Sequence, residues 1–146
     1  MRLEPLYRIR WTTPEGWSVD LFDGAEGQSF FIAEGRCEGQ VMGRFRAANF
    51  PRRRADGTLV PDFRGVVETD DGAVLMIALY GFLRSEGPGG RELVGSMTHL
   101  SDDDRYARLN DVVCTVVGEI TTGGVVVDVA ELVWEPLERL REPLSE

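Results

Sequence analysis

The chain of 146 residues is long enough for one domain, and its 42% hydrophobic and 28% charged residues are ordinary for a folded globular domain. Sixteen basic and 25 acidic residues give a formal net charge of −9, which disfavours nucleic acid as a partner, because that binding needs a basic surface. The basic residues are all arginine, so Schiff-base chemistry through lysine and a P-loop lysine are excluded.

Runs of β-branched and aromatic residues, separated by Gly, Asp and Pro, predict successive antiparallel strands. The predicted strands cover residues 5–11, 17–22, 28–33, 35–47, 58–69, 73–84, 91–100, 111–121 and 124–134. The sequence has no βαβ pattern, no GxGxxG opening a helix and no Walker motif, which disfavours a parallel sheet and nucleotide-binding folds. Helix is expected only as a turn near 101–109 and in the tail near 135–141.

Two segments bear on the kind of sheet. The strand at 73–82 is apolar on both faces, so both faces need cover, either in a barrel covered by another subunit or at a sandwich edge packed by the tail. In the segment 35–46 glycines recur every fourth residue on the face that also carries Cys37, Val41 and Phe45. Inward glycines allow a barrel to curve and leave space for a ligand, and both roles can hold at once.

The hairpins set a register and, with it, a candidate pocket. A two-residue type I′ turn at Asp71-Gly72 would place Val67 opposite Met76. Pairing Arg84 with Arg91 in the next hairpin would place Met76 opposite His99, although two like charges facing each other are unfavourable. One face then collects Phe63, Val67, Met76, Tyr80, Phe82, Leu93, Met97 and His99.

That face is an apolar surface with two polar tips, which is typical of a small-molecule pocket. His99 would act as a general base and Tyr80 as a hydrogen-bond donor or acid. The alternative is a histidine satisfied within the core and a tyrosine packed with its hydroxyl at the rim. No nucleophile elbow or other nucleophilic constellation is evident in the sequence.

Metal and redox chemistry have few candidate residues. Structural zinc needs Cys or His ligands in local pairs, and Cys37, Cys114 and His99 form no such pair. We expect no metal or cofactor, and both cysteines as buried free thiols. The run 102–104 of three aspartates suits a helix N-terminus, with a divalent cation site as the alternative. The basic run 52–54 suits a solvated loop, with a local anion or partner contact as the alternative.

The N-terminal residues lack the apolar stretch of a signal peptide, and no run approaches the ~20 apolar residues of a membrane span. We therefore expect a cytoplasmic protein with no membrane partner.

Short motifs between residues 62 and 118 resemble those of a bacterial family, the domain-of-unknown-function family 3237. They are Asp62-Phe63-Arg64-Gly65, Thr69-Asp70-Asp71-Gly72-Ala73, Tyr106-Ala107-Arg108-Leu109-Asn110 and Val117-Gly118. The resemblance covers roughly residues 28–134. The family's usual Gly-Gly-Asp-Trp element is not evident, and the aromatic-rich stretch before the Tyr-x-x-Leu-Asn segment is altered to 97–101.

The resemblance implies a small β-barrel like those of lipocalins and allene oxide cyclases, and it implies no reaction. It also implies Arg64, Tyr106 and Asn110 as groups of the lumen. The residue pattern itself places Arg64 on the face opposite Tyr80, where it would pair with Glu68. The two placements conflict if only one face lines the cavity.

Together these observations predict an all-β protein with one antiparallel barrel domain over 1–146 and a tail or short helix at 135–146. The leading function is binding of a small, mostly apolar, neutral or anionic molecule in the barrel, with cofactor-free isomerisation, cyclisation or hydrolysis as an extension. The alternative is a non-catalytic oligomeric or partner-binding module whose barrel is filled by side chains. The candidate ligand-binding residues are Phe63, Arg64, Met76, Tyr80, Met97, His99, Tyr106 and Asn110, of which His99, Tyr80 and Arg64 are also the catalytic candidates.

A homodimer is also expected. It would cover the face opposite the candidate pocket, which carries Val66, Leu75, Ile77 and Leu79.

Overall fold

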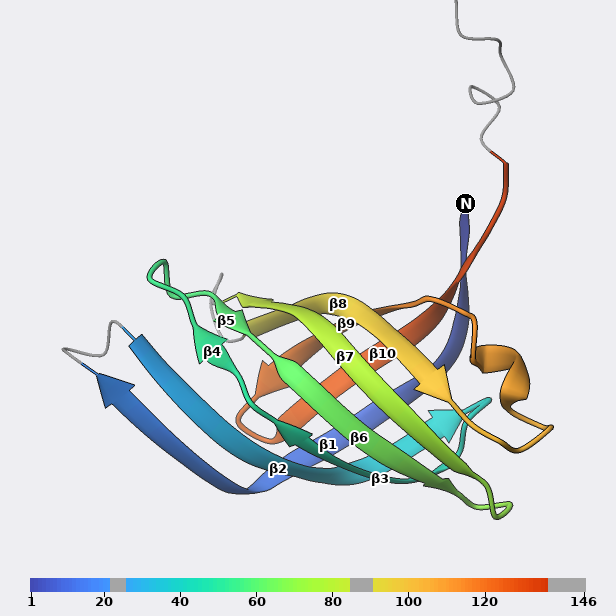
Figure 1. The fold of residues 1–146 in the computed structure, drawn as a ribbon, viewed down its shortest axis with the longest axis horizontal. Helices are drawn as coiled ribbons and strands as arrows, with labels where there is room; N and C mark the ends of the chain where they lie inside the picture. Colours follow the sequence, from blue (N-terminus) through green and yellow to red (C-terminus); the bar gives the residue numbers. More distant parts are fainter. Residues whose placement is uncertain (22–25, 85–90, 137–146) are drawn as a thin grey trace, which may run out of the picture.

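The computed structural model describes residues 1–21, 26–84 and 91–136, and the fold is an antiparallel β-barrel, as predicted. Eight strands close the barrel in the order β1-β10-β9-β8-β7-β6-β3-β2, and the pairing of β1 with β2 completes the circle (Figure 1). Two short strands, β4 and β5, bridge β2 and β7 at one end. The strands are β1 (Arg2–Leu21), β2 (Glu26–Gly39), β3 (Gly43–Asn49), β4 (Arg52–Arg53), β5 (Leu59–Val60), β6 (Asp62–Thr69), β7 (Val74–Arg84), β8 (Arg91–Leu100), β9 (Cys114–Thr121) and β10 (Gly124–Val133).

Several predicted strand boundaries are corrected. The two predicted strands at 5–11 and 17–22 are parts of one strand, β1, whose pairing with β2 shifts between Thr12 and Glu15. The predicted strand at 35–47 is instead the end of β2, a turn and the start of β3, and Gly39 at this turn has a φ of +135° that favours glycine. The predicted strand at 58–69 divides into β5 and β6 around Pro61.

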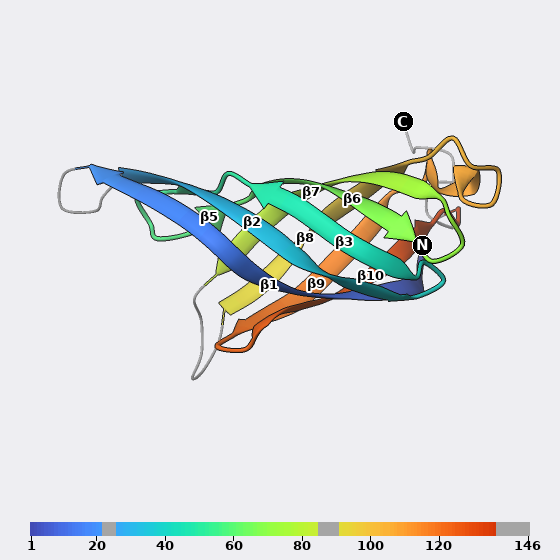
Figure 2. The same ribbon diagram turned by 90° about the horizontal axis from the view of Figure 1, so that it is seen from below.

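Beyond Thr12 the paired ends of β1 and β2 extend past the barrel as a two-stranded arm (Figure 1). Figure 2 shows that β8, β9 and β10 lie across the interior from β1, β2 and β3. At the opposite end from the arm lies the short 3₁₀ helix η1 (Ala107–Leu109), the only part of the predicted 101–109 helical turn that is helical. The arm therefore extends from one end of the barrel, and η1 covers the other end.

The turn between β6 and β7 differs from the predicted type I′ turn. Such a turn needs a positive φ at both central residues, and in this loop only Gly72 has one, at +92°. The loop has three residues, Asp70, Asp71 and Gly72, because the Thr69 N–H bonds to the Ala73 carbonyl at 2.9 Å. A loop that is one residue longer moves the pairing by one position along β7.

The observed register therefore differs from the predicted one in both hairpins. Val67 lies opposite Leu75 instead of Met76. In the next hairpin Arg84 lies opposite Glu92 instead of Arg91, and the two side chains approach to 3.9 Å, so an ion pair replaces the unfavourable arginine pair. Because side chains alternate along a strand, this slip of one residue turns the predicted face of β7 over.

The interior of β7 thus carries Leu75, Ile77 and Leu79, whereas Met76 and Tyr80 lie on the outside of the barrel. The face predicted to be covered by a second subunit is instead packed inside the barrel. The lumen core is formed by inward side chains from all eight barrel strands, among them Ile9, Cys37, Phe45, Val67, Met97, Cys114, Val116 and Val127.

The predicted loop at 85–90 and all of the predicted tail beyond residue 136 lie outside the described residues. Within residues 1–21, 26–84 and 91–136, no helix has both the length and the apolar character needed to cross a membrane.

Candidate functional site

A hollow of about 240 Å³ opens at the arm end of the barrel, and we call it the mouth pocket. Its walls come from strands far apart in the chain, including β1, β2, β7, β8 and β10. Most of the lining is apolar, which is typical of a site for a small organic molecule. The lining residues are Trp11, Thr13, Phe31, Ala33, Asn49, Pro51, Leu59, Pro61, Phe63, Leu79, Leu83, Arg91, Leu93, Ile120 and Val125.

Three aromatic rings separate this pocket from the deeper lumen. The Trp11 ring lies 5.3 Å from the Phe63 ring and 5.5 Å from the Phe45 ring, between centroids, and the Phe45 and Phe63 rings are stacked at 5.8 Å. Trp11 and Phe63 line the pocket, whereas Phe45 is fully buried and lies outside the lining. Below the rings the barrel is filled by side chains.

Three polar side chains supply the hydrogen-bonding capacity of the mouth pocket: Thr13, Asn49 and Arg91. The side-chain Oδ1 of Asn49 accepts a hydrogen bond from the Asp62 backbone N–H at 3.2 Å, which leaves both N–H donors of the side-chain amide for other partners. Arg91 is exposed at the start of β8 and contributes a positive charge and five N–H donors. These groups can orient a carbonyl or a carboxylate on a largely apolar molecule.

A second polar cluster lies deep in the lumen around His99. The Tyr7 hydroxyl lies 2.6 Å from His99 Nε2 and 3.2 Å from the Met97 sulfur, and His99 Nδ1 lies 4.0 Å from the Cys114 sulfur. Six residues along β8, about 20 Å of strand, separate His99 from Leu93 in the mouth pocket. Leu79, which lines the mouth pocket, pairs with Met97 of the cluster, so the cluster lies beneath the pocket but takes no part in its lining.

Burial decides the protonation of this cluster. It lowers the pKa of His99 to about 4, so the imidazole is neutral near pH 7, and it raises the pKa of Tyr7 well above its ordinary value. Tyr7 keeps its proton, and its hydroxyl and Nε2 of the neutral imidazole form one hydrogen bond whose donor is set by the imidazole tautomer. Burial also raises the pKa of Cys114 to about 11, so the sulfur remains a thiol. The arrangement matches the satisfied core histidine of the alternative prediction rather than a general base.

We expect Tyr7→Phe to lower the free energy of unfolding by about 1–3 kcal/mol, because it leaves the buried Nε2 of His99 without its hydrogen-bond partner. Urea unfolding followed by circular dichroism measures the change. Replacing the exposed Tyr80 with Phe removes a hydroxyl that water can replace, and this control should change stability by less than about 0.5 kcal/mol. Equal effects of the two substitutions would contradict a role for the Tyr7–His99 bond in stability.

The residues of the Thr-Asp-Asp-Gly-Ala and Tyr-x-x-Leu-Asn motifs meet at the other end of the barrel. The Tyr106 hydroxyl donates to Asp71 at 2.8 Å, and the Asn110 amide makes two hydrogen bonds to the backbone of Ser101, at 2.8 and 2.9 Å. Two Asp71 neighbours, the hydroxyls of Thr69 and Tyr106, hold the pKa of the Asp71 carboxyl below its ordinary value. This network anchors η1 across the end of the barrel.

The eight predicted ligand-binding residues do not form one site. Phe63, Met97 and His99 point into the lumen, as predicted, although only Phe63 reaches the mouth pocket. Met76 and Tyr80 lie on the outside of the barrel because the register is shifted by one residue, and Arg64 of β6 lies outside as well. The end of the barrel covered by η1 carries Tyr106 and Asn110.

Arg64 therefore follows neither of its predicted placements in full. It lies on the outer face, as the residue pattern indicated, and not in the lumen, as the family resemblance implied. Its nearest carboxylate is Asp62, at 3.7 Å, in place of the predicted Glu68, and its guanidinium donates to the Tyr80 hydroxyl at 3.5 Å.

Sequence reasoning missed most of the mouth pocket. Trp11, Phe31 and Leu79 lie on strands that were predicted, but nothing local in the sequence shows that the ends of these strands meet. One signal was available for Arg91, since its predicted pairing with Arg84 was unfavourable. In the structure Arg84 lies opposite Glu92 instead, and Arg91 lines the mouth pocket.

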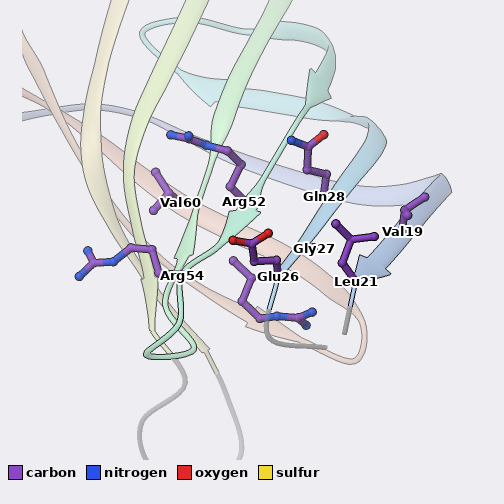
Figure 3. Close-up of a pocket in the computed structure, with 9 residues that line it drawn as sticks. Val19, Leu21, Glu26, Gly27, Gln28, Arg52, Arg54 and Val60 are labelled. Carbon is purple, nitrogen blue, oxygen red and sulfur yellow. The ribbon is translucent and has the colours of Figure 1, made fainter. Parts of the chain in front are cut away.

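The basic run lines a groove of about 600 Å³ between the arm and β4, shown in Figure 3. Arg53 donates to Asp20 on β1 at 2.7 Å, and Arg54 donates to Asp56 at 3.0 Å. Residues 52 and 53 are thus a short strand that holds the arm, rather than the predicted loop.

The remaining sequence features have local structural roles. In the acidic run, Asp103 pairs with Arg105 at 2.8 Å and accepts the Arg105 backbone N–H. Among the described residues no cluster of three or more Asp, Glu, His or Cys side chains forms a metal-binding arrangement. Cys37 and Cys114 are both buried and free, as predicted, and burial raises the pKa of Cys37 to about 12.

The fold and the pocket define this protein as a small closed β-barrel with a shallow apolar hollow at one end. Over residues 1–132 the sequence matches the family model described as a protein of unknown function, DUF3237. The chain belongs to this family, as its motifs indicated. A search of curated proteins found no match.

Solved structures with the same fold come from bacteria and a fungus. A β-barrel-like protein from Acinetobacter baumannii shares 21% identity with a TM-score of 0.82, covering 90% of this chain and 96% of that one. A protein of unknown function from Rhodopseudomonas palustris shares 16% identity with a TM-score of 0.80, covering 90% and 97% of the two chains. An enzyme from Penicillium herquei shares 19% identity with a TM-score of 0.70, covering 90% and 94%. At these identities the likeness concerns the fold alone.

Proposed function

We propose that the protein binds a small, mostly apolar organic molecule in the mouth pocket. The observation that carries the proposal is the composition of the lining, which is aromatic and aliphatic except for Thr13, Asn49 and Arg91. An apolar wall with a few fixed polar groups favours a ligand with an apolar body and one polar end. Arg91 favours a neutral or anionic end over a cationic one.

The pocket volume limits the size of this ligand. A cavity of about 150 Å³ lined by apolar side chains is enough for benzene, so the 240 Å³ of the mouth pocket fits one substituted ring. Pockets for larger, drug-sized molecules begin at about 300 Å³. Below the aromatic rings the barrel is filled by side chains, as in the alternative prediction of a packed interior. The ligand-binding hypothesis therefore concerns the arm end of the barrel alone.

Binding is better supported than catalysis by this geometry. The lining contains no histidine, carboxylate, cysteine or tyrosine among the described residues, so it offers no general base or acid that titrates near neutral pH. The Penicillium enzyme shares the barrel, but function depends on the groups of a site rather than on the fold. A catalytic role would need a group supplied by the ligand itself or by a partner.

The test is calorimetric titration of the protein with benzoate and substituted benzoates, which are single substituted rings that match the pocket volume. We expect Ala33→Phe, which fills the pocket, to abolish binding, and Arg91→Ala to weaken binding of the acids by about tenfold while sparing their amides. Leu83→Trp, at the same pocket, provides a second filling variant if Ala33→Phe does not fold.

Matched controls come from the outer surface. Arg64→Ala and Tyr80→Phe change polar groups that lie outside the barrel, so they should leave the affinity unchanged. A loss of affinity in these two variants, with none in the filling variants, would place the ligand on the outer surface. Absence of binding by the wild-type protein across the series would favour a non-catalytic interaction module.

A further inference from the structure

The outside of β7 is unusually apolar for a surface strand. Val74, Met76, Tyr80 and Phe82 alternate with the inward residues, and the Met76 and Phe82 side chains are 55% and 49% exposed. Ala78 continues the stripe between them. A strand with one face toward solvent normally alternates apolar and polar residues, so this strand has the composition of one that is covered on both sides.

Neighbouring strands widen this stripe at both ends, while the uncharged Ser96 and Thr98 of β8 lie beside Tyr80 and Ala78. The register places Leu100 of β8 beside Met76, Val94 of β8 beside Phe82, and Val117 of β9 beside Val94. All three of these neighbours are exposed. We call this surface the outer β7 face; its members are Val74, Met76, Ala78, Tyr80, Phe82, Val94, Leu100 and Val117.

The charges around the outer β7 face largely cancel. Arg64, which lies beside Ala78, approaches Asp62 to 3.7 Å, and at the far end of β7 Arg84 approaches Glu92 to 3.9 Å. The chain as a whole has a formal net charge of −9, so two copies repel each other over most of their surfaces. Glu68 lies beside Val74 at one end of the face, and the Arg54 guanidinium lies 6.0 Å from the centre of the Phe82 ring at the other, so the rim of the outer β7 face carries charges of both signs.

We propose that the outer β7 face is the interface of a homodimer. Its exposed apolar side chains offer on the order of 600 Å² per protomer, close to the ~800 Å² that each partner contributes to a standard stable interface, before any polar rim is counted. Met, Tyr and Phe, which are enriched at the centre of interfaces, lie in the middle of the face. The expectation of a dimer is thus kept, but on the opposite face of β7 from the one the sequence indicated.

The interface is independent of the mouth pocket. None of the members of the outer β7 face lines that pocket, so binding and assembly can be disturbed separately. A variant that separates the protomers should still bind the ligand of the mouth pocket.

Light scattering coupled to size-exclusion chromatography at micromolar concentration tests the proposal. The wild-type protein should have the mass of a dimer, and Met76→Glu should be a folded monomer, because a buried pair of like charges raises the dissociation constant by a hundredfold or more. Val19→Glu is the matched control, since it adds the same charge at an apolar side chain of the arm that is 66% exposed, and it should remain a dimer.

Phe82→Glu provides a second variant on the same face, and circular dichroism confirms that each variant is folded. A monomeric wild-type protein would overturn the proposal and leave the face for a different partner. A dimer that survives both Met76→Glu and Phe82→Glu, or that is lost in Val19→Glu, would also overturn it and would place the interface elsewhere.

Discussion

Replacing Ile77 with aspartate should unfold the protein. The Ile77 side chain is 4% exposed and points into the lumen, between Gly65 of β6 and His99 of β8. The substitution removes the packing of a large aliphatic group, which costs about 2–5 kcal/mol, and it buries a carboxyl group without a partner, which adds several more. The total approaches the whole free energy of unfolding of an ordinary domain, about 5–15 kcal/mol.

The adjacent residue gives the matched control. Met76 is on the same strand but outside the barrel, so Met76→Asp should give a folded protein, whose cooperative unfolding transition is retained even where the dimer is lost. Circular dichroism and urea unfolding of the two variants compare them directly. The predicted and the observed registers differ by one residue, so a folded Ile77→Asp together with an unfolded Met76→Asp would contradict the observed register.

Ile77 and Met76 also show which features of the fold could be predicted from the sequence and which could not. The strands and the antiparallel barrel could be predicted, because alternation and turn residues are local properties of the chain. The register of β7 could not, since the strand is apolar on both faces and hydrophobicity alone did not select the inward one. The Asp71-Gly72 dipeptide fits a two-residue turn and also the observed three-residue loop, in which only Gly72 has a positive φ.

One local signal did favour the observed register. Pairing Arg84 with Glu92 brings opposite charges together, whereas the predicted pairing with Arg91 brought like charges together. Cross-strand charge pairs are worth only a fraction of a kcal/mol to about 1 kcal/mol, so this signal was weaker than the preference for a short hairpin turn.

The candidate site was beyond prediction for a different reason. The mouth pocket exists because the ends of β1, β2, β8 and β10 meet where the barrel closes, and closure depends on pairings between β1 and β10 that are more than a hundred residues apart in sequence. The motif residues were easier to notice and less informative about function. Tyr106 and Asn110 hold η1 against the barrel through Asp71 and Ser101, so these residues, which the resemblance implied as lumen groups, anchor a barrel end instead.

The pH dependence of stability should report the state of His99. In the folded protein burial lowers its pKa from 6.5 to about 4, so the unfolded chain binds more protons than the folded one between these values. Its contribution to stability is complete above pH 6.5 and is lost progressively as the pH falls toward 4. For a side chain only 3% exposed, the loss amounts to about 3 kcal/mol.

Urea unfolding at intervals from pH 7.5 to 4.5 measures this loss, and His99→Gln is the control. Glutamine has no titratable group and offers an oxygen to the Tyr7 hydroxyl near the position of Nε2, so the variant should show a much flatter profile across the same range. The carboxyl groups of Asp56, Asp71 and Asp103 have lowered pKa values, so they take up protons in the folded protein mainly below this range. A wild-type profile as flat as that of His99→Gln would mean that the imidazole is readily protonated in the folded protein, and the neutral Tyr7–His99 pair would then be wrong.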